Sequence, residues 1–180
     1  MEPAVTRGGE RGTSLIEVLV ATGLLVTMMA GLMAMSGMAI STTENQGHLA
    51  ARTTEYAQDK MEQLMALAYS DATSDTRVFP AAAGGGSGLA AGGSYNVDAP
   101  VALYVDYLDD DGNLCGSTGA KCAAPAGTTP PDKWYYKRVW KIDVVATNLK
   151  QITVASATTR GFGGSVRATS YLTVLKTNPF

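Results

Sequence analysis

The sequence of 180 residues is poor in histidine, cysteine and charge. One His and two Cys are too few ligands for a four-coordinate zinc site of the usual kind. Charged residues make up 17% of the chain, whereas soluble domains usually carry roughly 25%. The 14 basic and 16 acidic residues give a net charge of −2, which disfavours a dedicated nucleic-acid-binding domain because such domains are normally basic. The length favours one domain with an appendage.

The scarcity of charge is greatest near the N-terminus. No Lys or Arg occurs between Arg11 and Arg52, and the 26 residues 18–43 include no charged residue. As a helix they would measure roughly 39 Å, whereas a bilayer core needs about 30 Å and a cleaved secretory signal has an apolar region of only about 7–15 residues. The run therefore predicts a transmembrane helix. Arg7 and Arg11 precede it, so the positive-inside rule leaves its N-terminus in the cytoplasm.

One carboxylate, that of Glu17, lies about one helical turn inside this apolar segment. An ionisable group within a membrane span is costly, and a functional partner is its usual explanation. A structural alternative is a capping box, Ser14-x-x-Glu17, in which the acid also offsets the helix dipole. The cap explains an acid in the first turn, but it does not explain the Arg11-Gly12 pair before it.

The junction Arg11-Gly12-Thr-Ser-Leu-Ile-Glu17-Val-Leu-Val, followed by an apolar helix, resembles the class III signal of type IV prepilins and type II secretion pseudopilins. The resemblance covers about the first 45 residues. It implies that residues 1–12 are a leader, that a prepilin peptidase cleaves between Gly12 and Thr13, that Thr13 is then N-methylated, and that Glu17 guides subunit assembly. Two features are more typical of minor pilins than of major ones. Thr13 stands where major pilins usually carry phenylalanine, and residues 13–79 include no proline.

The size, the acid at Glu17 and the strand-rich C-terminal region make the chain most similar to the PilV-type minor pilins, which act in tip or initiation complexes. The resemblance implies a non-catalytic subunit in the bacterial inner membrane before assembly and in a periplasmic or cell-surface filament afterwards. The expected partners are other major and minor pilins, reached through residues 13–43, the prepilin peptidase, the inner-membrane assembly platform and a tip adhesin. No cofactor, no metal and no nucleic acid is expected.

Two other functions remain open. One is a signal-anchored periplasmic or extracellular binding or adhesion module, in which Glu17 is only a cap. The other is a competence pseudopilin that takes up DNA, whose binding would weaken steeply with salt. An enzyme is not expected, because the only histidine, His48, falls on the polar side of the predicted helix and no Ser/His/Asp or Cys/His set can be assembled outside it.

The helix is predicted to continue to about Tyr69, with residues 44–69 amphipathic and Lys60 snorkelling from the apolar arc. The apolar arc comprises Leu49, Tyr56, Ala57, Met61, Leu64, Leu67 and Ala68. The polar arc on the opposite side comprises Arg52, Glu55, Asp59, Glu62 and Gln63. Residues 70–93 are predicted to be a flexible, low-complexity loop. Residues 94–180 predict four or five antiparallel strands in meander order. One of them covers residues 101–108, and turns at 148–150 and 161–164 separate the later ones. The expected fold is therefore α+β and pilin-like, a long helix packed on an antiparallel sheet.

Three clusters in residues 94–180 are candidate sites. Asp106, Asp109, Asp110, Asp111 and Asn113 offer calcium ligands, but the EF-hand spacing fails and a plain acidic turn is favoured. Cys115 and Cys122 are expected to form a structural disulfide outside the cytoplasm, contributing about 2.5 kcal/mol. The stretch from Lys133 to Lys141 interleaves basic and aromatic residues as single-strand nucleic-acid surfaces do. Strand alternation explains it without a ligand, with Lys133, Lys137 and Lys141 on one face and both tryptophans on the other.

Overall fold

The computed structural model describes residues 14–159 and 167–178. The chain divides into two compact units, Met1–Thr43 and Glu44–Phe180, and each is described by itself below. The leader, the cleavage pair Gly12 and Thr13 and the glycine-rich turn at 161–164 lie outside the described residues.

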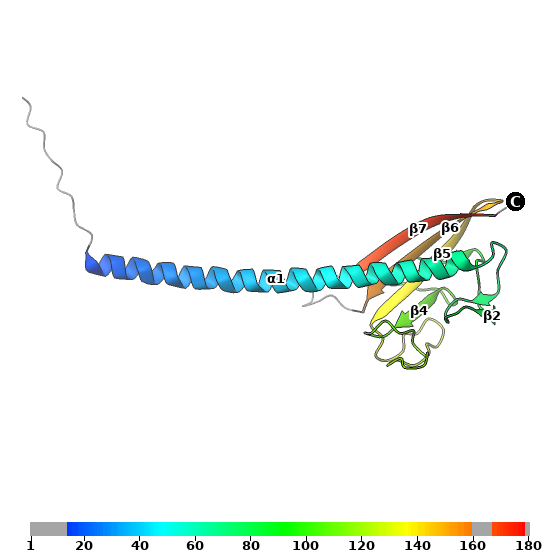
Figure 1. Ribbon diagram of the computed structural model, residues 1–180, viewed down its shortest axis with the longest axis horizontal. Coiled ribbons are helices and arrows are strands. Elements are labelled where there is room, and N and C mark those ends of the chain that lie inside the picture. Colours follow the sequence, from blue (N-terminus) through cyan, green and yellow to red (C-terminus); the bar gives the residue numbers. More distant parts are fainter. Residues whose placement is uncertain (1–13, 160–166, 179–180) are drawn as a thin grey trace, which may run out of the picture. The chain divides into compact units, whose positions relative to one another are not determined.

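Helix α1 runs from Leu15 to Ala66 (Figure 1). In the first unit its large apolar side chains are exposed, and the helix is long and apolar enough to cross a membrane by length and composition. Several of its hydroxyl groups bond within the helix: Thr22 donates to the Val18 carbonyl at 2.9 Å and Thr27 to the Leu24 carbonyl at 2.8 Å. Such bonds lower the cost of polar side chains in an apolar surrounding.

In the second unit α1 packs one stripe of side chains on a sheet. The buried positions are Thr53, Tyr56, Ala57, Lys60, Met61 and Leu64, with the three- and four-residue spacing of a helix face. The predicted apolar arc is thus confirmed at its centre, whereas Ala68 is exposed. The prediction that Lys60 snorkels to solvent is wrong, because its side chain is fully buried.

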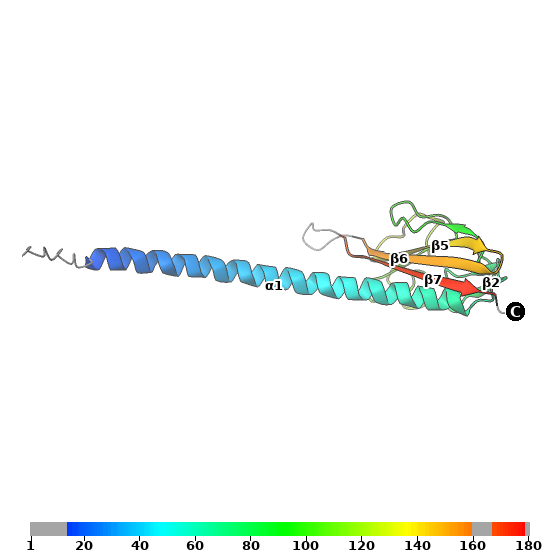
Figure 2. The same ribbon diagram turned by 90° about the horizontal axis from the view of Figure 1, so that it is seen from above.

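The sheet has five antiparallel strands. They are β3 (Gly92–Gly93), β4 (Val105–Leu108), β5 (Tyr136–Ala146), β6 (Leu149–Thr158) and β7 (Thr169–Thr177). Their order is β3-β5-β6-β7, with β4 also paired to β5. Figure 2 shows β5, β6 and β7 side by side. The α+β class and the antiparallel meander of the last three strands are confirmed, whereas β3 and β4 share one partner strand.

Two segments differ from the sequence prediction. The strand predicted from residue 101 begins only at Val105, since Leu103 has a φ of 70°, which strand geometry does not allow. The segment predicted to be a flexible loop, residues 70–93, includes a small two-stranded sheet of β1 (Ser74–Asp75) and β2 (Ala82–Gly85) and also β3. It also contributes Leu89, which is fully buried against the helix-facing side of the main sheet.

Both faces of the main sheet are covered. On one face Trp140, Ile142, Ile152 and Val154 pack against α1. On the other, Val139 and Ala155 pack under Val97, Tyr107 and the two cysteines. Trp134 packs on this second side, so the prediction that the two tryptophans share a face is wrong. Lys133 has a φ of 63° and β5 starts only at Tyr136, so strand alternation does not extend to Trp134.

Helix α1 ends three residues before the predicted Tyr69. Its last turn contains no basic residue, and the Lys176 ammonium from β7 instead donates to the carbonyls of Met65, at 2.7 Å, and Leu67. At the other end of β7, Ser170 shares hydrogen bonds with Thr53 and Thr54. A cation at a helix C-terminus satisfies free carbonyls and the helix dipole. These contacts fix α1 along β7, both running in the same direction.

Candidate functional site

Glu17 lies in the first turn of α1 and its side chain is exposed. The Ser14 carbonyl accepts hydrogen bonds from the backbone N–H of Glu17 at 2.9 Å and of Val18 at 3.2 Å. Among residues 14–159 and 167–178, neither the Ser14 hydroxyl nor the Glu17 carboxylate has a hydrogen-bond partner, so the side-chain bonds of a capping box are not formed there. The carboxylate therefore remains available to a group outside this part of the chain.

The second unit holds a buried ion cluster. Asp106 on β4 lies directly opposite Arg138 on β5 in the sheet register. The Arg138 guanidinium donates to both Asp106 carboxylate oxygens, at 2.7 and 2.9 Å, and the Lys60 ammonium lies 2.8 Å from one of them. Lys60 also lies 3.9 Å from the centre of the Trp140 ring, a favourable cation–π distance. One acid thus joins the helix to two strands.

Burial and charge act in opposite directions on these groups. Burial lowers the pKa of Lys60 from 10.5 to about 8, because desolvation of the ammonium outweighs the attraction of Asp106. Burial disfavours ionisation of Asp106, but Arg138 and Lys60 together hold the pKa of this carboxyl below its usual value. The bidentate pair with Arg138 keeps Asp106 an anion. Because a carboxylate anion is a poor electrophile, the Lys60 amine is not expected to form an amide bond with Asp106. The cluster is therefore better explained by a structural role.

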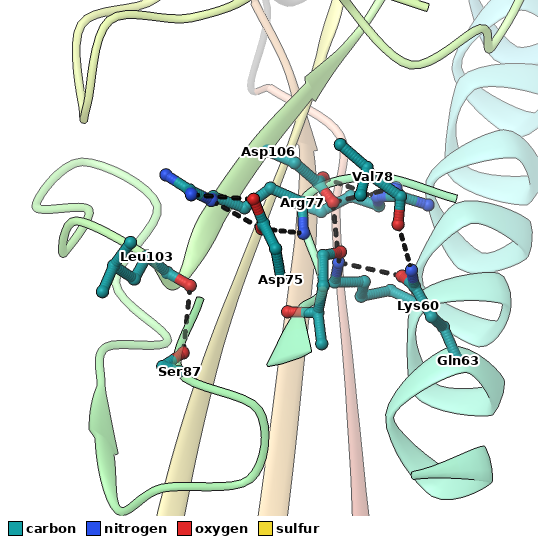
Figure 3. A network of polar contacts seen from close by, with 10 residues as sticks. Lys60, Gln63, Asp75, Arg77, Val78, Ser87, Leu103 and Asp106 are labelled. Carbon is teal, nitrogen blue, oxygen red and sulfur yellow. Dashed lines mark hydrogen bonds and ion pairs between the residues drawn. The ribbon is translucent and has the colours of Figure 1, made fainter. Parts of the chain in front are cut away.

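The same helix segment holds the loop after β1. Lys60 donates to the carbonyl of Thr76, and Gln63 donates to the carbonyl of Val78 at 2.6 Å and accepts from Lys60 at 3.0 Å. Figure 3 shows these contacts between the helix and the loop. The next residue, Phe79, leaves 81% of its area exposed. Two hydrogen bonds to α1 therefore fix the backbone just before a large exposed aromatic side chain.

The acidic turn is organised by its first carboxylate. Asp109 accepts from the backbone N–H of Asp111, Asn113 and Lys121 and from the Asn113 side chain. The Lys121 ammonium lies 2.8 Å from Asp110 and 2.9 Å from Asp111. The three acids lie close enough to share an ion, but a lysine already neutralises two of them and Asp106 points into the buried cluster. The contacts support the plain acidic turn.

The predicted disulfide between Cys115 and Cys122 is present. Both cysteines are buried and pack against Val139 and Ala155 on the second face of the sheet. The bond therefore closes the loop that covers this face, in agreement with a structural role.

The basic and aromatic stretch does not offer a row of free cations. Lys137 is 8% exposed and lies 5.5 Å from the centre of the Trp134 ring, while Arg138 is committed to Asp106. Lys141 pairs with Asp143 at 2.9 Å. Partners within the fold thus account for these three basic residues. The predicted separation of the lysines from the tryptophans is wrong, because Lys137 is buried beside Trp134.

A cavity of about 720 Å³ opens beside α1. One wall is a helix stripe of Asp59, Glu62, Gln63 and Ala66, spaced so that all four share one face. Phe79 and the buried or half-buried side chains of Leu108, Leu114 and Arg138 line the rest, together with Gly112, Asn113 and Ser117. The volume is in the range of small-ligand sites.

Sequence reasoning identified Glu17, the cysteines and the acidic turn, but it missed the buried ion cluster and the cavity. A signal for the cluster was present: Lys60 lies within the apolar arc, and Asp106 lies between the apolar residues Val105 and Tyr107. A charge inside an apolar pattern indicates a buried partner of the opposite sign. His48 is exposed on α1, where the sequence placed it.

Comparison with protein-family models, with curated proteins and with solved structures finds no match to this chain.

Proposed function

We propose that this chain is a minor pilin of a type IV pilus, or a pseudopilin of a type II secretion system, and that it takes part in initiating or assembling the filament at or near its tip. The observation that carries the proposal is the isolated carboxylate of Glu17 at the start of an apolar helix. Residues 18–43 add no charge, and no hydrogen bond to a described residue satisfies the carboxylate. Its position five residues after Gly12 is the one that the prepilin resemblance requires.

The assembly step follows from electrostatics. Cleavage after Gly12 would expose an ammonium at Thr13 and remove Arg7, Glu10 and Arg11. An unpaired carboxylate in a low-dielectric medium is costly, so Glu17 of an incoming subunit gains by pairing with the Thr13 ammonium of a subunit already in the filament. The apolar helix would then leave lipid for a bundle of similar helices, whose contacts its small residues Gly23, Gly31 and Gly37 favour.

The layout of the second unit also supports this role. The amphipathic half of α1 covers one face of an antiparallel sheet, and the disulfide-closed loop covers the other. A subunit that presents a packed head on the helix that anchors it meets the needs of a filament. The bidentate pair on Asp106 and the partnered lysines assign the buried charges to holding this head together.

The test compares Glu17→Ala with Glu44→Ala, which removes an acid from the same helix outside residues 18–43. Both variants should insert into the membrane, and only Glu17→Ala should fail to enter filaments, measured by immunoblotting sheared filaments against membranes. Mass spectrometry of the wild-type chain from filaments should find a mature N-terminus at methylated Thr13. Filaments in which residues 1–12 are retained, or into which Glu17→Ala enters normally, would contradict the proposal.

A further inference from the structure

The cavity beside α1 has an aromatic rim that is held in place before any ligand arrives. Gln63 and Lys60 bind the carbonyls of Val78 and Thr76, so the backbone leading to Phe79 is fixed while its ring is 81% exposed. A large exposed apolar side chain on a cavity is a common anchor of a binding site. Because the loop is already ordered, binding there costs little conformational entropy.

A second part of the cavity lining, on α1, is acidic. Asp59 and Glu62 are exposed, and within the part of the chain that the structure describes neither forms an ion pair or a hydrogen bond. The nearby acids differ, because Asp110 and Asp111 share Lys121. Arg138 also reaches the cavity, but its guanidinium is paired with Asp106, to which Nε and one of the two Nη atoms donate. The free charge at the cavity mouth is therefore negative.

The rest of the lining includes apolar side chains. Leu108 is 2% exposed and Leu114 is half-buried, and Ala66 continues the helix wall below the two acids. A ligand that matches this lining has a cationic end for Asp59 and Glu62 and an apolar body for Phe79 and the leucines. An arginine side chain meets both needs, since its planar guanidinium pairs with carboxylates and its stem and plane pack on aromatic rings.

We infer that this cavity receives an arginine side chain, with an adjoining apolar residue, presented by a partner protein. The inference concerns the second unit alone, so it stands or falls independently of the role of Glu17 in filament assembly. Opposite charges at a rim contribute mainly to specificity and to the rate of association, so discrimination between charged and neutral ligands is the property to measure.

The test uses the full chain in detergent micelles with isotope-labelled leucine methyl groups, observed by NMR. The probe is acetyl-Arg-Leu-amide, and its matched control is acetyl-citrulline-Leu-amide, which has nearly the same shape without the charge. The arginine peptide should shift the Leu108 and Leu114 methyl signals with millimolar affinity and bind up to about fivefold more tightly than the citrulline peptide. Added salt should narrow that difference.

Two pairs of variants separate the rims. Asp59→Asn with Glu62→Gln should abolish the preference for arginine, whereas Glu44→Gln with Asp132→Asn, which removes the same charge from exposed positions outside the cavity lining, should retain it. Phe79→Ala should weaken the binding of both peptides. Tyr171→Ala, at another exposed aromatic residue, on β7, should weaken the binding of neither. Equal affinity for the two peptides, or no saturable shift at these leucines up to about 10 mM, would overturn the inference.

Discussion

The Lys60 ammonium lies 2.8 Å from the Asp106 carboxylate, and neither side chain is more than 1% exposed. The two residues are 46 positions apart, one on α1 and one on β4. Through Asp106 the helix is joined to Arg138 on β5, and through Lys60 it is joined to the loop that carries Phe79. The pair therefore fixes the position of the helix on the sheet and one rim of the cavity together.

Asp106→Asn should destabilise the second unit strongly. The substitution keeps the volume but leaves Lys60 and Arg138 as buried cations without an anion, which typically costs about 3–5 kcal/mol. Asp143→Asn is the control, because it breaks a half-exposed pair with Lys141 and should cost less than about 1 kcal/mol. Urea unfolding followed by tryptophan fluorescence reports on this unit, which contains both tryptophans. Equal losses in the two variants would show that the cluster contributes little.

Lys60 should make stability rise with pH above neutrality. The pKa of Lys60 is about 8 in the folded protein, whereas the ordinary value for a lysine, which applies to the unfolded chain, is 10.5. Between these two pH values the unfolded chain binds more protons than the folded one, so the free energy of unfolding increases as pH rises. Relative to Lys60→Met, the wild-type free energy of unfolding should increase by on the order of 2 kcal/mol between about pH 7 and pH 9.5.

The upper limit of that range matters because burial raises the pKa of Tyr136 to about 12 and raises that of Tyr56. Tyrosines that stay protonated in the folded state make the protein less stable above about pH 10. Their effect on the free energy of unfolding is therefore opposite to that of Lys60. The difference from Lys60→Met isolates Lys60 from them. A flat difference across the range would mean that the ammonium is not desolvated as the structure indicates.

Local patterns were sufficient for much of the fold. The charge-free run predicted the first part of α1, three- and four-residue spacing predicted its buried stripe, and the Asn148 turn between alternating segments predicted the β5–β6 hairpin. These features depend on neighbours in the sequence. The end of α1 was predicted too late because no Gly or Pro marks it. The helix ends where Lys176, over a hundred residues away, binds the carbonyls of Met65 and Leu67.

The candidate functional residues likewise fall into those that local sequence patterns predict and those that depend on contacts between distant segments. Glu17 and the cysteines were found because motif and spacing are local. The cluster of Lys60, Asp106 and Arg138 depends on the sheet register and on which helix face meets β4, neither of which the sequence determines alone. Lys60 was assigned to solvent by the general cost of burying an ammonium. In the fold, Asp106 and carbonyl groups offset that cost.

Replacing Cys115 and Cys122 together with serine should destabilise the second unit by about 2.5 kcal/mol, the loop-closure value for a ring of this size. The loss should grow further because both positions are buried against Val139 and Ala155, where a hydroxyl lacks the packing of a sulfur atom. Unfolding of the oxidised and reduced wild-type chains gives the disulfide contribution without the mutation. If reduction left the unfolding midpoint unchanged, the loop would be held by packing alone.

Gly112→Ala should be more damaging than Gly119→Ala, although the two glycines have almost the same backbone. Their φ values are 89° and 88°, a region that costs an L-residue about 1–2 kcal/mol. A side chain at 119 would meet open space, whereas one at 112 would run into the ring of Tyr56, which packs edge-on against Tyr136 at 4.7 Å. The difference in unfolding free energy between the variants therefore measures the contact of the acidic turn with the helix.

Because burial raises the pKa of Tyr56, displacing its ring into solvent should lower that pKa in Gly112→Ala and leave it unchanged in Gly119→Ala, as followed by NMR titration. Equal stabilities and unchanged Tyr56 titration in both variants would show that the turn does not press on α1.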